Sequence, residues 1–193
     1  MLAAARAAFA ERGFDGATIR GIAGAAGVDP ALVHHYFGSK DKLFLAAVQA
    51  PADPAELLPE VLAARHEELG ESIVRLLLKV WDGPAGPAGL ALVRSAIGNE
   101  WTAKLLREFL VSQVLRRVMG TLDLSPAERE ARGALVASQL FGVVMARYVL
   151  RVEPLATASA ESLIAAVGPT VQRYLTGDVV LPEPADSRPR PAS

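Results

Sequence analysis

Apolar residues along this chain recur three or four positions apart in almost every segment, which is the spacing of one face of an α-helix. Alternating or β-branched runs bounded by turns are missing, apart from a possible short strand at 178–181. The pattern therefore predicts an all-α protein. We expect helices near residues 1–12, 18–26, 30–37, 39–50, 54–65, 67–82, 87–98, 100–122, 126–151 and 159–175.

Three of these helix starts carry strong local signals. Asp29, Asp53 and Ser125 each stand directly before a proline, which matches an N-cap followed by proline at the first helical position. Glu56 and Glu128 follow the last two caps by three residues, which completes a capping-box pattern. These starts are therefore predicted from side-chain chemistry as well as from periodicity.

The predicted helices differ in length along the chain. The first four are short and joined by tight turns, whereas those beyond residue 99 are long. We therefore expect an N-terminal domain over residues 1–48 and a C-terminal domain over residues 49–177. The remaining stretch, 178–193, is rich in proline and poor in apolar residues, and we expect it to be disordered.

The clearest local pattern lies between residues 18 and 37. Its first helix places small and apolar residues at helical spacing, through Ile19, Ile22, Ala23 and Ala26. Gly27 ends this helix where a left-handed backbone is needed, and Asp29 caps the next one. Val33, with Tyr36 or Phe37, returns an apolar face to the first helix. Two such helices predict a helix-turn-helix, whose second helix enters the major groove of DNA, and an ordinary helical hairpin is the alternative.

The residues around this pattern narrow its interpretation. The run from Phe9 to Phe14 ends a first helix, and the run YFGSKDKLF from Tyr36 to Phe44 opens a fourth. In order, spacing and residue type, these residues resemble the DNA-binding domain of the tetracycline-repressor (TetR) family over about residues 1–48. The resemblance implies a homodimeric transcriptional regulator, usually a repressor, with a variable C-terminal helical domain for effector binding and dimerisation. The family usually has a lead-in, often basic, before its first helix, whereas Met1 falls inside that helix here.

The resemblance also implies which residues contact double-stranded operator DNA. The family's contact positions fall on Thr18, Arg20, Pro30, Ala31, Leu32, His34, His35, Tyr36 and Lys40. Hydroxyl and N–H groups at a helix start can hold phosphates. Pro30 and Ala31 offer only apolar contact, so hydrogen bonds to bases would come mainly from other residues. We expect those bonds from His34, His35 or Arg20, and a solvated or packed histidine pair is the alternative.

The last two long helices carry the predicted dimer interface. Small residues recur every four positions on the first of them, at Ala134, Ser138, Gly142 and Ala146, so another helix can approach closely. In TetR-like proteins the corresponding helices of two subunits form a four-helix bundle. The expected interface residues are Ala134, Ser138, Phe141, Gly142, Met145, Ala146, Leu163, Val167 and Val171. The alternative is that both helices only complete the core of one chain, and Pro169 should kink the second helix.

The middle of the chain is richer in aliphatic and aromatic residues than a connecting layer requires. These residues are Leu69, Ile73, Leu77, Trp81, Leu92, Trp101, Leu105 and Phe109. A pocket for a small hydrophobic effector is expected here, mainly from the resemblance, with Leu77, Trp81, Trp101, Leu105 and Phe109 as its lining. The alternative is that these residues simply fill the core.

Composition adds mainly exclusions. The 193 residues include 20 basic and 21 acidic ones, a net charge of −1, which by itself gives no sign of nucleic-acid binding. The absence of cysteine excludes disulfides, thiolate metal sites and cysteine nucleophiles. No catalytic motif is present, so we expect no enzymatic activity, no cofactor and no metal.

The chain also lacks an apolar run long enough for a membrane span and an export-signal core, so we expect a cytoplasmic protein without a membrane partner. The alternative to a ligand-released operator-binding regulator is a helical small-molecule-binding or protein-interaction module that does not bind an operator.

Overall fold

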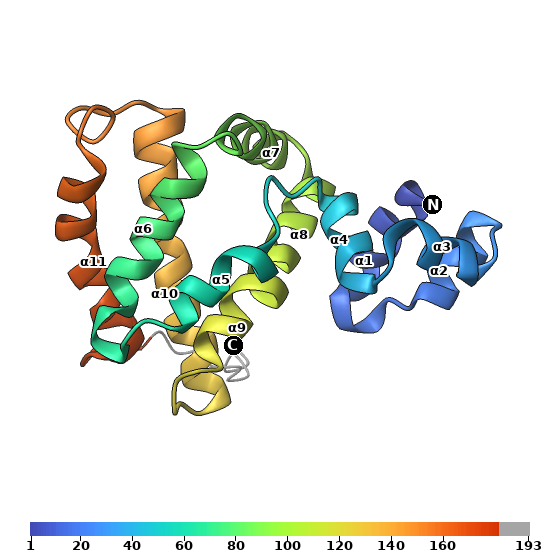
Figure 1. Cartoon of the computed structure of the whole chain (residues 1–193), viewed down its shortest axis with the longest axis horizontal. Coiled ribbons are helices and arrows are strands. Elements are labelled where there is room, and N and C mark those ends of the chain that lie inside the picture. The colour runs from blue at the N-terminus through green and yellow to red at the C-terminus, as the bar shows by residue number, and fades with distance from the viewer. Residues whose placement is uncertain (182–193) are drawn as a thin grey trace, which may run out of the picture.

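The structure, a computed structural model, describes residues 1–181 and consists of helices and their connections in that part of the chain (Figure 1). The helices are α1 (Leu2–Gly16), α2 (Ile19–Ala26), α3 (Pro30–Phe37), α4 (Lys40–Val48), α5 (Pro54–Leu62), η1 (His66–Glu68), α6 (Leu69–Trp81), α7 (Gly86–Gly98), α8 (Glu100–Phe109), η2 (Leu110–Leu115), α9 (Arg116–Met119), α10 (Pro126–Val144), η3 (Met145–Val149) and α11 (Ala160–Thr176). The all-α prediction is confirmed. None of the helices within residues 1–181 is long and apolar enough to cross a membrane.

Differences from the predicted boundaries have local causes. The strand considered at 178–181 is not formed, and the rest of the predicted disordered tail, 182–193, lies outside the described residues. α1 runs to Gly16, but its backbone leaves the helical conformation at Gly13, where φ is 69° and ψ is 176°, so a kink falls directly after the predicted end at residue 12. The helices predicted at 100–122 and 126–151 each contain a π-helical segment, which is η2 after α8 and η3 after α10. A hydrophobic pattern cannot distinguish these wider turns from α-helix, because they occur as short insertions within an otherwise regular helix.

The helices form two groups that lie side by side (Figure 1). α1–α4 make the smaller group and α5–α11 the larger one, and α8 packs against α1 and α4. Phe9 and Phe14 contact Phe44 in the smaller core, with ring centroids 4.7 and 5.2 Å apart. Leu105 and Phe109 of α8 are buried in this same core. The boundary between residues 48 and 49 therefore stays a prediction, because α8 belongs by its packing to both groups.

The larger group is organised by the close crossing of α6 and α11. Gly70 on α6 faces Gly168 on α11, and a Cβ at Gly70 would overlap the carbonyl oxygen of Gly168. Gln172 fixes the register, because its Oε1 accepts from the Gly70 N–H and its Nε2 donates to the His66 carbonyl, both at 2.8 Å. α11 continues as one helix through Pro169, where the sequence predicts a kink.

This crossing covers part of the predicted dimer interface. Leu163, Val167 and Val171 are only 2%, 8% and 0% exposed in the single chain. They pack in the core that contains Ile73 and Val74 of α6. Helical spacing identified an apolar face on α11 but could not show which neighbour covers it. In the single chain these three residues complete the core, which is the alternative that the sequence left open for them, and their part in a dimer interface stays a prediction.

We expect Gly70→Ala to destabilise the fold. The added Cβ would meet backbone atoms of α11, and overpacking of this kind costs about 1–3 kcal/mol. Because each kcal/mol shifts the Tm of a chain of this size by about 2–4 °C, calorimetry should record a fall of several degrees. Gly24→Ala is the matched control, since a Cβ there has nothing within 4 Å. A Gly70→Ala protein with the same Tm as the wild type would show that α6 and α11 do not cross tightly at this position.

Candidate nucleic-acid interface and apolar cavity

The turn between α2 and α3 sets the geometry of the helix-turn-helix. Gly27 has a left-handed backbone, with φ at 67°, and its N–H donates to the Ala23 carbonyl. The N–H of Val28 donates to the same carbonyl at 3.0 Å. Asp29 then begins α3 by accepting a hydrogen bond from the Ala31 N–H at 2.7 Å. The residues through which the two helices pack in the shared core are buried, namely Ile22, Ala23 and Val33.

The outer face of α3 is open to solvent. Ala31, Leu32, His34, His35 and Tyr36 are exposed, and Pro30 is half-buried at the helix start. Tyr36 is 65% exposed, and its ring packs edge-on against His35 with centroids 5.4 Å apart. The structure thus brings the residues predicted on the third helix together on one accessible helix.

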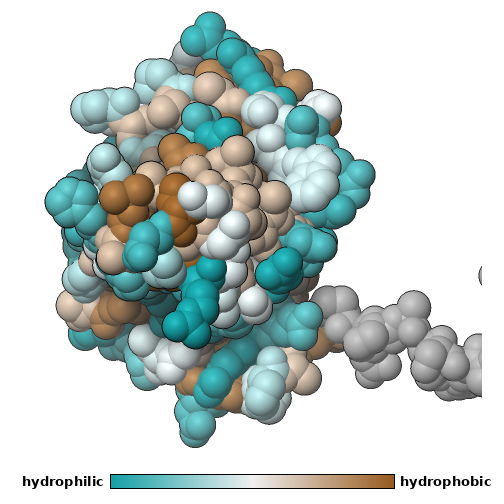
Figure 2. All heavy atoms as spheres, turned by 90° about the vertical axis from the view of Figure 1, so that its right-hand side faces the viewer, coloured by the Kyte–Doolittle hydropathy of each residue, from teal (hydrophilic) through white to brown (hydrophobic). Residues whose placement is uncertain are grey.

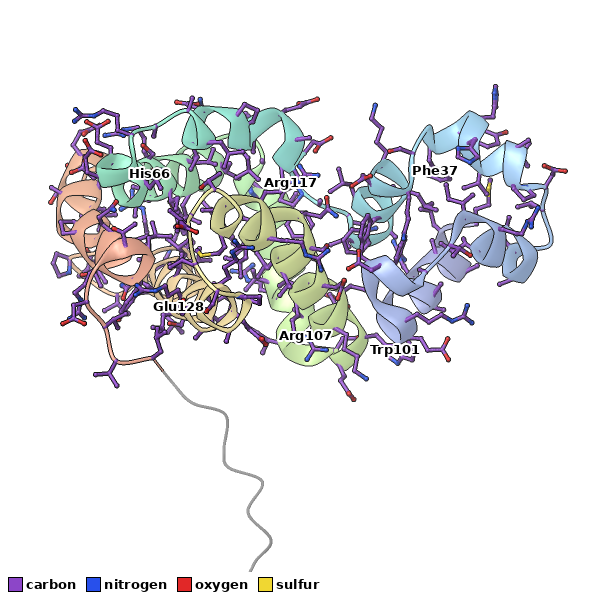
Figure 3. The ribbon with its side chains drawn as sticks, turned by 90° about the horizontal axis from the view of Figure 1, so that it is seen from below. Phe37, His66, Trp101, Arg107, Arg117 and Glu128 are labelled. Atoms are coloured by element: carbon purple, nitrogen blue, oxygen red, sulfur yellow. The ribbon has the colours of Figure 1, made fainter. Side chains whose placement is uncertain are left out.

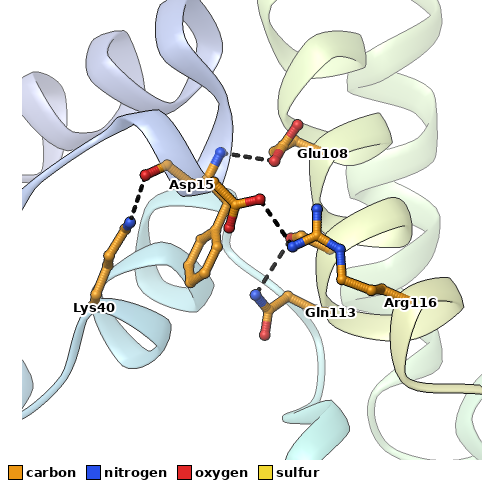
Figure 4. A network of polar contacts seen from close by, with 7 residues as sticks. Asp15, Lys40, Glu108, Gln113 and Arg116 are labelled. Atoms are coloured by element: carbon orange, nitrogen blue, oxygen red, sulfur yellow. Dashed lines mark hydrogen bonds and ion pairs between the residues drawn. The ribbon is translucent and has the colours of Figure 1, made fainter. Parts of the chain in front are cut away.

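Two of the predicted contacts are already engaged within the chain. Nδ1 of His34 lies 3.3 Å from the Gly38 carbonyl oxygen, which turns the ring toward the end of α3. The ammonium group of Lys40 donates to the Asp15 carbonyl at 3.3 Å and lies 4.7 Å from the centre of the Phe14 ring (Figure 4). Lys40 is therefore directed toward the end of α1, apart from the outer face of α3.

The start of α2 supplies the remaining predicted contacts. Thr18 caps the helix by accepting from the Gly21 N–H at 3.1 Å, so its own hydroxyl proton is available to another acceptor. Arg20 is exposed beside it and forms no ion pair within residues 1–181. Figure 2 views the molecule from this end, where hydrophilic side chains surround smaller apolar areas. This surface can offer hydrogen bonds, one free guanidinium group and apolar contacts to a groove.

A cavity of about 240 Å³ lies within the C-terminal group of helices. It is lined almost wholly by apolar side chains from α5, α6, α7, α8, η2 and α10. Leu77, Trp81 and Phe109 of the predicted pocket line it, as do Ile73 and Leu92. Sequence reasoning missed other lining residues on α5, η2 and α10, namely Leu57, Leu110, Val114, Ala137, Leu140 and Val144. No local signal could identify these residues, because the space they enclose is created by packing.

Two residues predicted for this pocket lie elsewhere. Leu105 is buried in the N-terminal core, so it faces α1 and α4 and not the cavity. Trp101 is 56% exposed, and it lines a separate crevice beside Arg6 and Ala7 of α1 (Figure 3). Its ring lies 5.7 Å from the ammonium group of Lys104. Trp101, Leu105 and Phe109 follow one another at four-residue spacing, so they share a face of α8 but lie about one turn apart along it. Successive turns meet different neighbours, and only Phe109 of the three lines the cavity.

A polar cluster adjoins the cavity at Trp81. The ring of Tyr148 stacks on Trp81 with centroids 5.3 Å apart. Its hydroxyl donates to Oδ1 of Asp82 at 2.9 Å, and Arg147 lies 3.5 Å from the other carboxylate oxygen. Burial, with the hydrogen bond to Asp82, raises the pKa of Tyr148 to about 12. Tyr148 thus connects Trp81, which lines the cavity, to the carboxylate of Asp82.

The exposed face of α10 holds the rest of the predicted interface residues. Ala134, Ser138, Phe141 and Gly142 are exposed, and Met145 and Ala146 are half-buried. A Cβ at Gly142 would have nothing within 4 Å. In the single chain this stripe is thus an uncovered surface of small residues. The described residues contain no group of His, Asp and Glu side chains suited to a metal ion.

Comparison with known proteins decides the class. The description "Bacterial regulatory proteins, tetR family" matches residues 1–47, and "Tetracyclin repressor-like, C-terminal domain" matches residues 67–175. The regulator BetI of Agrobacterium fabrum is 33% identical over 156 residues, which cover 76% of this chain and 74% of that protein. The chain belongs to the TetR family.

Other similar proteins are also named as transcriptional regulators or repressors. The repressor AcnR of Corynebacterium efficiens is 44% identical to this TetR-family chain over 52 residues, covering 27% of this chain and 28% of that protein. A crystal structure of a TetR-family regulator from Streptomyces coelicolor A3 is 34% identical and covers 90% of this chain and 91% of its own, with a TM-score of 0.46. This TetR-family protein is a DNA-binding transcriptional regulator, a class of protein that is generally not enzymatic.

In this TetR-family regulator we expect Tyr36→Ala to weaken operator binding without unfolding the chain. Tyr36 is 65% exposed, so its removal leaves the core intact, and loss of a base contact costs about 1–3 kcal/mol. Ile97→Ala is the matched control, because Ile97 is 64% exposed on α7 and far along the chain from α3. Fluorescence anisotropy of labelled operator DNA measures both variants. If the Tyr36→Ala protein kept full sequence-specific affinity, Tyr36 would not be a DNA-contacting residue.

Proposed function

We propose that this chain is a homodimeric repressor that binds a near-palindromic operator and is released from it by a small hydrophobic effector. The observation that carries the proposal is that α8 contributes to two sites at once. Phe109 lines the apolar cavity and is also buried in the core of the helix-turn-helix region. A molecule in the cavity therefore contacts a side chain that supports the DNA-binding helices.

Operator binding is assigned to the open surface of α3 and the start of α2. His35 and Tyr36 are the best candidates for base edges, because both are exposed and neither side chain is held by another part of the chain. Arg20 and the helix start at Thr18 are the proposed phosphate contacts, since N-terminal N–H groups attract anions. Lys40 would join them only after leaving the Asp15 carbonyl.

Dimerisation is assigned to the exposed face of α10. The stripe that contains Ala134, Ser138 and Gly142 lets a second helix approach closely, and Phe141 is 43% exposed beside it. Exposed small residues on the outer face of α11, Ala165 and Ala166, extend the same kind of surface. A two-fold dimer presents two copies of α3 to half-sites about 34–36 Å apart, or a multiple of this, along the DNA.

The cavity selects the chemical class of the effector. Its wall offers almost no polar group, and burying an unpaired charge there would be costly. Its volume of about 240 Å³ is at or below the usual range for ligand pockets, roughly 300–1,000 Å³. The proposed effector is therefore a small, uncharged and mostly apolar molecule. Binding of such a molecule that favours one orientation of the DNA-binding helices would lower operator affinity by about 1–3 kcal/mol.

We expect Gly142→Arg to give a folded monomer. The residue is exposed in the single chain and a Cβ there has nothing within 4 Å, so the arginine costs the monomer little. In the proposed dimer the same side chain would separate the two copies of α10. Light scattering measures the mass, and Gly24→Arg supplies the same substitution at an open helical glycine away from α10. A Gly142→Arg protein that remains a dimer would place the interface elsewhere.

We expect an apolar probe to be reported by Trp81 and not by Trp101. These are the only two tryptophans, and only Trp81 lines the cavity. Naphthalene should therefore change the fluorescence of the Trp101→Phe protein as it does the wild type, and the Trp81→Phe protein should lose the response. Operator DNA should weaken naphthalene binding by the same factor as naphthalene weakens operator binding, because linkage is reciprocal. Equal naphthalene affinity with and without operator would contradict the proposed release.

A further inference from the structure

We propose that the segment from Glu108 to Arg117 positions the DNA-binding helices and carries the occupancy of the cavity to them. The inference rests on the proposed function, because it concerns how an occupied cavity changes operator binding. Three observations on this one segment support it: its polar contacts with the N-terminal helices, its apolar contacts with the cavity, and its backbone conformation.

The first observation is that the segment holds the N-terminal helices by polar contacts (Figure 4). Oε1 of Glu108 accepts from the Phe14 backbone N–H at 2.7 Å. Nη1 of Arg116 lies 2.9 Å from Oδ2 of Asp15, on the next residue of the same turn. Glu108 precedes η2 and Arg116 follows it, so both ends of this π-helix contact the end of α1. We call Glu108 and Arg116 the clamp.

Asp15 connects the clamp to Lys40. Asp15 pairs with Arg116 through its side chain and accepts from Lys40 through its backbone carbonyl. A second ion pair, between Arg117 and Asp41, joins the same segment to α4 at 3.7 Å. The start of α4 is therefore held by the same segment as the end of α1.

The second observation is that the segment lines the cavity. Phe109, Leu110 and Val114 all line it, and all three also pack in or against the core of the N-terminal helices. A molecule that enlarges the cavity would push on side chains that the N-terminal core requires in their present positions. Displacement of these residues must move the clamp, because Phe109 is adjacent to Glu108 and Val114 lies two residues before Arg116.

The third observation is the backbone between the two clamp residues. Residues Leu110–Leu115 form the π-helix η2, and π-helical turns occur frequently at functional sites. Ser112 and Gln113 within it are the buried polar side chains of residues 1–181. Gln113 donates to Ser112 at 3.3 Å and accepts from Arg117 at 3.1 Å. The buried amide thus links the interior of the π-turn directly to a residue that faces α4.

A π-turn can transmit movement because its pairing is adjustable. Its N–H groups bond five residues back, and a turn that returns to four-residue pairing rotates the helix C-terminal to it by up to about 100° per residue of register. Even a part of such a rotation would carry Arg116 away from Asp15 while Glu108 stayed on Phe14. The clamp would then hold α1 at one point and no longer fix its orientation.

The test compares clamp variants with a matched ion-pair control. The double variant Glu108→Gln with Arg116→Gln weakens both clamp contacts, and neither residue lines the cavity. Lys79→Gln is the control, because the Lys79–Glu60 pair has the same 2.9 Å separation and its side chains are similarly exposed, at 61% and 65% against 57% and 68%. Naphthalene is the probe, Trp81 fluorescence in a Trp101→Phe background reports its binding, and operator affinity is measured with and without it.

We expect naphthalene to weaken operator binding by roughly tenfold in the wild type and in Lys79→Gln, within the usual range of about 5–150-fold for coupled sites. In the clamp variant the naphthalene affinity should be unchanged, and the effect on the operator should fall below twofold. A clamp variant that responds like the wild type would overturn the proposal. So would a wild type that binds naphthalene at Trp81 without any change in operator affinity.

A second experiment tests the clamp independently of whether the cavity is the effector site. If naphthalene does not change Trp81 fluorescence, the effector site of the proposed function is wrong, and the clamp is judged without a ligand. Operators whose half-sites are moved one base pair closer or farther measure how firmly the DNA-binding helices are oriented. The wild type and Lys79→Gln should discriminate among them more strongly than the clamp variant does. Equal discrimination by all three proteins would show that Glu108 and Arg116 position nothing.

Discussion

The packing of α8 into the N-terminal core is the interaction on which the rest of the structure depends. Leu105 and Phe109 are buried among side chains of α1 and α4, so apolar burial sets where the helix-turn-helix sits. Full burial of each such side chain contributes about 1.5–3 kcal/mol, whereas an exposed ion pair contributes about 0–1 kcal/mol. The apolar residues therefore hold the two groups of helices together. The ion pairs at Arg116 and Arg117 can only adjust the orientation.

The two sides of the cavity differ in how tightly they are packed. α6 is locked to α11 by the contact of Gly70 with Gly168 and by the hydrogen bonds of Gln172, which leave no space for adjustment. The opposite side consists of α8 and η2. η2 has a π-helical backbone and contains a buried polar pair, Ser112 and Gln113. A bound molecule would therefore act on the side that also contacts the N-terminal helices. Close packing makes this distinction, because a tightly packed crossing cannot deform without overlap.

Several features of the candidate site could be predicted from local sequence because local chemistry decides them. The turn at Gly27 needs a left-handed residue, and the cap at Asp29 needs a short acceptor, so both were visible in the order of residue types. Exposure of His35 follows from the burial of Val33 on the same short helix, because residues two apart point to different sides of a helix. Helical spacing left open whether Tyr36 or Phe37 packs beside Val33, and the structure packs Phe37 against the core and leaves Tyr36 65% exposed. The contacts of Lys40 with Phe14 and Asp15 could not be predicted, since they depend on how α4 crosses the end of α1.

The sequence by itself determined the helices, their caps and the helix-turn-helix, because hydrophobic period, capping and backbone preference act within a few residues. Only the tertiary structure decided which apolar face meets which neighbour. Leu163, Val167 and Val171 have the same spacing whether they face α6 or a partner, and Trp101 and Phe109 lie on one helix yet face different surroundings. The cavity, the covered face of α11 and the clamp arise between segments far apart in the chain. Their positions follow from the summed burial of all helices, which no local pattern contains.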